Sequence, residues 1–127
     1  MLAATLLVVL LVSACGGDDR PAVGEWQPIW EGILADFPAA AELGDPPDRS
    51  ICTESLGVLR TTSSDLYPTP DPAIESVVDE WVRVAEQILF ECAPSTGGTP
   101  NLESEYAELA RLEAEVAVVL SIDSNEG

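Results

Sequence analysis

The spacing of apolar residues constrains the fold of this chain more than any other feature. Between residues 25 and 122, apolar residues recur at steps of three and four, which is the period of one face of an α-helix. No useful length alternates with the period of two expected of a half-buried strand. Pro and Gly clusters divide the pattern into four segments. We therefore predict an all-α fold, a small antiparallel four-helix bundle with up-down-up-down connectivity. A two-helix hairpin with loosely attached flanks is the alternative.

Helix-terminating residues set the expected ends of the first two helices. The first helix is expected to have Pro28 in its first turn and to end at Gly44. The second is expected to open at Asp45, and the Thr and Ser residues at 61–64 weaken its end. Apolar positions that define the two faces are Trp26, Trp30, Ile33, Leu34, Phe37 and Ala41, followed by Ile51, Cys52, Leu56 and Leu59.

The third segment has the most regular apolar stripe. Asp71 is placed to cap it, Pro72 suits its first turn, and Pro94 stops it. The fourth segment opens at Thr99–Pro100 and precedes an acidic tail at 123–127. The two stripes consist of Ile74, Val77, Val78, Trp81, Ala85, Ile88, Leu89 and Cys92, then Leu102, Tyr106, Leu109, Leu112, Val116, Val119 and Leu120.

The N-terminus carries a short apolar run followed by a cysteine. Residues 2–12 are apolar except for Thr5, a length typical of a signal-peptide core and too short for a stable transmembrane helix. The following Val12-Ser13-Ala14-Cys15 resembles the lipobox of bacterial lipoproteins, and the small residues after it are similar to those of actinobacterial members. The resemblance implies cleavage of a signal peptide at 1–14, lipidation of Cys15 and a location on the extracytoplasmic face of the cell membrane. The small and polar residues that follow predict a flexible tether at 15–24. The alternative is an apolar helix with a chance cysteine.

Two further cysteines remain once Cys15 is assigned to a lipid. An even remainder in an exported domain predicts a disulfide between Cys52 and Cys92. The topology supports this pairing independently, because the second and third segments would meet at the Pro-rich turn and bring their far ends together. The second segment is the shorter of the two, so extended backbone at 61–64 is expected to make up the difference in length. Two buried free thiols are the alternative.

The charge of the chain excludes several classes of function. Its 127 residues contain 23 Asp and Glu, five Arg, no Lys and no His, for a net charge of −18. A chain of this charge does not bind nucleic-acid phosphates electrostatically, and it is repelled by anionic lipid headgroups. The lack of His removes the commonest general base and zinc ligand. The sequence predicts no catalytic residue, no metal site and no cofactor.

Three tryptophans offer the remaining candidate site. Trp26 and Trp30 are four residues apart, and Trp81 lies in the middle of the third stripe. Core packing explains all three, while the alternative is an aromatic groove that binds an apolar or glycan ligand. Carboxylates at Glu103, Glu105 and Glu108, or at Asp79 and Glu80, fit a solvated helix face better than a hydrolase site.

We expect the chain to be a lipid-anchored interaction module, attached to the membrane through the lipid on Cys15. Its acidic surface favours a basic protein or envelope partner and disfavours nucleic acid. A carrier of a small hydrophobic or lipid ligand, held in a groove between helices, is the alternative function. A carboxylate-based envelope hydrolase is a distant third.

Overall fold

The computed structural model describes residues 19–44, 47–92 and 102–126, which are mostly helical and contain no strand. The elements in chain order are α2 (Val23–Asp36), α3 (Ala40–Leu43), α4 (Arg49–Thr62), a 3₁₀ turn η1 (Ser63–Leu66), α5 (Pro72–Cys92) and α6 (Leu102–Glu126). The predicted all-α class is confirmed for these residues.

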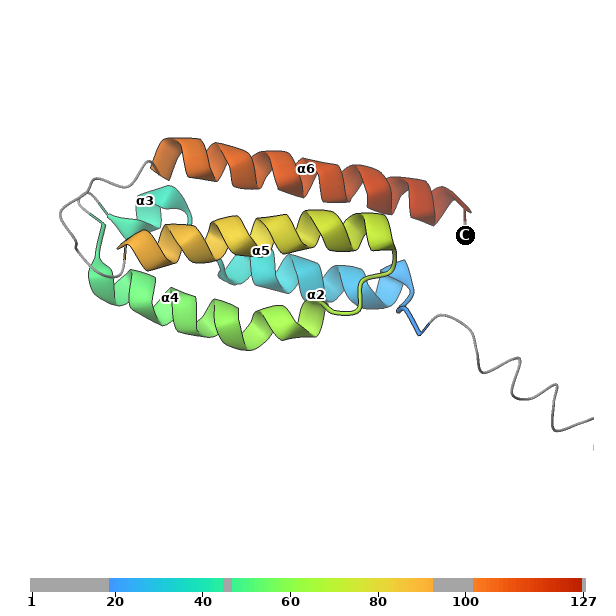
Figure 1. Cartoon of the computed structure of the whole chain (residues 1–127), viewed down its shortest axis with the longest axis horizontal. Coiled ribbons are helices and arrows are strands. Elements are labelled where there is room, and N and C mark those ends of the chain that lie inside the picture. Colours follow the sequence, from blue (N-terminus) through green and yellow to red (C-terminus); the bar gives the residue numbers. More distant parts are fainter. Residues whose placement is uncertain (1–18, 45–46, 93–101, 127) are drawn as a thin grey trace, which may run out of the picture.

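The four longer helices lie roughly parallel to one long axis, and each runs opposite to the one before it (Figure 1). Helix α5 lies between α4 and α6 and packs extensively against both. One continuous apolar core joins them, and every long helix contributes to it. Its largest fully buried side chains are Trp26, Trp81, Leu43, Leu66, Ile74, Ile88 and Leu89.

Helix α5 matches its sequence prediction at its N-terminal end, whereas Pro94, expected to stop it, lies outside the described residues. The Asp71 carboxylate accepts a hydrogen bond from the backbone N–H of Ala73 at 2.8 Å, so Asp71 caps the helix as expected. The helix then runs from Pro72 to Cys92. Its buried residues follow the predicted stripe, with Val84 added and Val77 only half-buried.

Helix α2 differs from the prediction at both ends. It begins at Val23, so Pro28 lies in the second turn rather than the first. It ends at Asp36 instead of continuing to Gly44, because the residue before a proline avoids the helical region. Phe37, which precedes Pro38, is extended with ψ of 128°. The remaining residues form the separate short helix α3.

The chain entering α2 is held against the start of α5. The Arg20 guanidinium donates to the carbonyl oxygen of Thr69 at 3.0 Å and to the Glu75 carboxylate at 3.3 Å. Thr69 is fully buried, so Arg20 is hydrogen-bonded to a residue in the interior of the protein. This contact falls within the tether expected over 15–24, of which residues 15–18 lie outside the described residues.

Helix α4 begins later than predicted and continues further. Asp48 caps it by accepting a hydrogen bond from the backbone N–H of Ser50 at 2.8 Å, so the helix starts after Asp48 rather than at Asp45. The expected extended backbone at 61–64 is wrong, since this stretch is helical and passes into η1. A 3₁₀ turn rises about 2.0 Å per residue against 1.5 Å for an α-helix, which contributes to the missing length.

The predicted disulfide between Cys52 and Cys92 is confirmed. It joins the first turn of α4 to the last residue of α5 across 40 positions of sequence, with Cα atoms 5.9 Å apart. Both cysteines are buried in the core.

Helix α6 continues to Glu126, so most of the expected acidic tail forms its last turn. The predicted signal peptide at 1–14 and Cys15 lie outside the described residues. Within 19–44, 47–92 and 102–126, no helix has the length and apolar character needed to cross a membrane.

Candidate interaction surface

The three tryptophans form an aromatic cluster inside the core. Trp26 stacks on Trp30 with ring centroids 5.7 Å apart, and Trp30 meets Trp81 edge to face at 5.1 Å. Each ring is at most 3% exposed. The indole N–H of Trp26 donates to the carbonyl oxygen of Leu66 at 2.8 Å, which fixes η1 against α2. The structure therefore brings the three predicted residues together, chiefly as packing.

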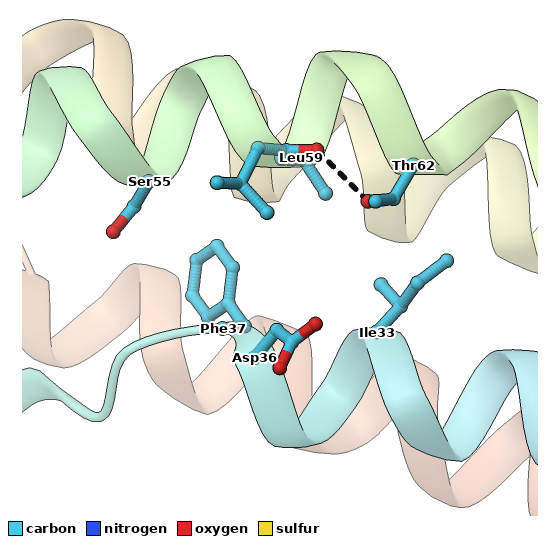
Figure 2. A pocket seen from close by; sticks show the side chains of 7 residues that line it. Ile33, Asp36, Phe37, Ser55, Leu59 and Thr62 are labelled. Atoms are coloured by element: carbon cyan, nitrogen blue, oxygen red, sulfur yellow. Dashed lines mark hydrogen bonds between the residues drawn. The ribbon is translucent and has the colours of Figure 1, made fainter.

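A narrow crevice separates α2 from α4. Figure 2 shows Ile33, Asp36 and Phe37 on one side and Ser55, Leu59 and Thr62 on the other. The Thr62 hydroxyl donates to the carbonyl oxygen of Val58 at 2.9 Å, so it is engaged within its own helix. The accessible volume of about 10 Å³ is close to that of one water molecule. This crevice is too small for an organic ligand.

A larger groove lies between α2 and the C-terminal half of α6. Its volume is about 380 Å³ and it is open to solvent. Helix α2 contributes every third or fourth residue of its second and third turns, and α6 contributes the facing positions. The lining residues are Gln27, Trp30, Glu31 and Leu34 from α2, and Glu113, Ala117, Leu120, Ser121 and Ser124 from α6. Only Trp30 belongs to the predicted aromatic site.

Carboxylates stand in both walls of this groove. Glu31 accepts a hydrogen bond from the Gln27 side-chain amide at 3.2 Å. Glu113 is half-buried, and burial raises its pKa, while the indole N–H of Trp81 opposes this rise. That indole N–H is buried, and no described residue accepts a hydrogen bond of normal geometry from it. Its effect on the Glu113 pKa indicates that the carboxylate lies near it. The groove thus joins an apolar floor to acidic walls.

Most of the other candidate carboxylates lie on the outer surface and pair locally. Glu108 and Glu115 flank Arg111 on α6, and Glu80 pairs with Arg83 on α5. Asp79 accepts a hydrogen bond from the Tyr67 hydroxyl. These contacts agree with the solvated helix faces expected from the sequence.

Glu105 is an exception among them. It lies on α6 beside Glu91 of α5, and one of its carboxylate oxygens is buried. Burial raises the pKa of Glu105 to about 7, and the neighbouring Glu91 carboxylate adds to the rise. The sequence pattern did not separate Glu105 from Glu103 and Glu108, because the difference arises only from the packing of α6 against α5.

The raised pKa of Glu105 predicts a pH-dependent stability. Between its ordinary pKa of 4.5 and its folded value of about 7, the folded chain holds a proton that the unfolded chain has lost. The contribution of Glu105 to the free energy of unfolding therefore falls as the pH rises from about 5 to about 8. Urea unfolding across this range should show a weaker fall in Glu105→Gln. The matched variant Glu103→Gln, an exposed residue on the same helix, should follow the wild type; equal curves for all three proteins would contradict the assignment.

Among the described residues, no group of three or more His, Cys, Asp or Glu side chains is arranged to hold a metal ion. The chain was also compared with protein-family models, curated proteins and solved structures. None of them matches.

Proposed function

We propose that this protein is a lipid-anchored module on the extracytoplasmic face of a bacterial membrane, and that it docks a basic partner. In this proposal α2, α4, α5 and α6 form an antiparallel four-helix bundle with up-down-up-down connectivity, carried by a lipid on Cys15. The lipobox-like residues 12–15 support the anchor, and the disulfide supports an oxidising compartment.

The observation that carries the docking half of the proposal is the acidic groove between α2 and α6. Its walls hold Glu31 and Glu113 on a body whose chain has a net charge of −18. Such a field speeds association with a cationic partner and suppresses anionic ones. Consequently, binding of a basic partner should weaken as salt passes about 0.15 M, where the screening length is about 8 Å.

The Cys15→Ser variant tests the anchor. We expect the wild-type chain, expressed in a bacterium, to incorporate labelled fatty acid and to partition into detergent. The variant should do neither, because it lacks the thiol that accepts the diacylglyceryl group. The Cys52→Ser/Cys92→Ser variant serves as the control for loss of cysteine and should remain labelled. Equal labelling of wild type and Cys15→Ser would refute the anchor.

A further inference from the structure

The groove between α2 and α6 has the chemistry of a docking site for a particular kind of segment. We propose that it receives a basic amphipathic segment of a partner protein. Lys or Arg stems would lie along Leu34, Ala117 and Leu120, and their charged ends would reach Glu31 and Glu113. This inference rests on the proposed function, since it names the surface through which the basic partner docks.

The extent of the groove suits such a segment. On α2 it runs from Gln27 to Leu34 and on α6 from Glu113 to Ser124. At about 1.5 Å per residue these stretches cover roughly 10 and 17 Å, or two to three helical turns. A partner helix presents anchor side chains over the same length, at positions i, i+3 or i+4, and i+7.

The charge of the groove indicates which kind of molecule binds in it. Glu31 and Glu113 line it, and none of the chain's five arginines is among the described lining residues. An acyl chain with a carboxylate head would meet two like charges here. A second copy of the chain would bring a further charge of −18 to the interface. A cationic side chain with an aliphatic stem satisfies both the apolar floor and the acidic walls.

The surroundings of Glu113 strengthen this argument. Its carboxylate has already lost part of its hydration, and the buried Trp81 indole lies on its inner side. A cation arriving from the open side would favour the charged form that burial disfavours. A positive group bound in the groove would therefore offset part of the cost of burying the Glu113 carboxylate.

An uncharged strip on α6 extends the apolar part of the surface. Residues 116–122 contain no charged side chain. Within this strip Val118 and Ile122 are 59% and 51% exposed, whereas Ala117 and Ser121 border the groove. Apolar residues of an amphipathic partner can pack on this strip while its basic residues enter the groove.

The binding test uses the full chain in nanodiscs of neutral phosphatidylcholine, with empty nanodiscs as the blank. The probe is a fluorescein-labelled peptide whose Leu and Lys residues follow a helical repeat, and its anisotropy is measured at several salt concentrations. A peptide of the same length with Gln in place of Lys is the neutral comparison. We expect salt-sensitive binding of the Lys peptide and at least tenfold weaker binding of the Gln peptide.

Matched variants locate the binding. Glu31→Gln/Glu113→Gln should weaken binding of the Lys peptide by about tenfold. The control Glu54→Gln/Glu103→Gln removes the same charge from exposed positions outside the groove and should change binding less than twofold. Ala117→Trp should block the groove, whereas Ala114→Trp, also at an exposed alanine of α6, should not. Circular dichroism and thermal melting confirm that each variant folds.

The possible negative results contradict different parts of the proposal: the position of the binding site, the docking function or the nature of the bound molecule. If the Lys peptide binds with salt sensitivity but the groove variants match their controls, the groove assignment is wrong and the proposed function stands. If no salt-sensitive binding occurs, the docking function fails as well. Equal binding of the Gln peptide identifies an apolar carrier groove, and groove-dependent self-association without peptide identifies a second copy as the occupant. Either result replaces the basic segment.

Discussion

Reduction of the Cys52–Cys92 disulfide is expected to lower the free energy of unfolding by about 4 kcal/mol. In the chain-entropy model, a bridge that closes a 40-residue separation restricts the unfolded chain by this amount. Because small domains are stable by only about 5–15 kcal/mol, the bridge is a large share of the total. The bridge also joins the ends of α4 and α5 that lie farthest from their connecting turn. Without it, these two ends are linked covalently only through both helices and that turn.

Urea unfolding with and without a phosphine reductant measures this effect. The Cys52→Ser/Cys92→Ser variant is the control, since it lacks the bridge and should be indifferent to the reductant. Peptide mapping under non-reducing conditions should show the linked pair in protein purified without reductant. A reductant effect below about 1 kcal/mol would contradict a stabilising bridge.

Replacement of Trp81 by alanine is expected to cost about 3–5 kcal/mol of stability. The ring is 1% exposed and meets both Trp30 and Phe37 edge to face, at centroid distances of 5.1 and 5.5 Å. The substitution removes the ring that packs α5 against Trp30 of α2, and it leaves a cavity in the core. The side chains around a cavity relax only partly, which is why the cost exceeds the loss of buried area alone.

The matched variant is Phe90→Ala on the same helix. Phe90 is 58% exposed, so its replacement should change the free energy of unfolding by no more than about 0.5 kcal/mol. Urea unfolding of the two variants and the wild type gives the comparison. Similar stabilities for Trp81→Ala and Phe90→Ala would show that the aromatic cluster does not hold the core together.

Helix α5 shows how far the sequence alone could predict this fold. Asp71 and Pro72 supply local capping chemistry, and the stripe that ends at Cys92 is long and regular. The disulfide followed from topology and cysteine count. In contrast, the break at Phe37–Pro38 was missed because apolar spacing continues across it, although the proline itself was a usable signal.

The groove could not be predicted from spacing. Gln27, Glu31, Glu113, Ala117 and Ser121 read individually as polar or small residues on solvated helix faces. They become one surface only because α2 lies beside the end of α6, a contact between segments that are distant in sequence. The three tryptophans were candidates in the sequence only because they are large aromatic residues. A large apolar residue is a better indicator of a buried core position than of a binding site.

The positions of the chain ends bear on how the molecule would stand above a bilayer. Helix α2 begins and α6 ends at one end of the helical body, and the disulfide lies toward the other (Figure 1). From Cys15 to Arg20 the backbone spans at most about 18 Å, and Arg20 is hydrogen-bonded to Thr69. With Cys15 in the membrane, the end carrying the disulfide would be the distal one. The groove, which lies along the second and third turns of α2 and the C-terminal half of α6, would open on the side of the body between the bilayer and its distal end, within reach of a partner that itself sits at the bilayer surface.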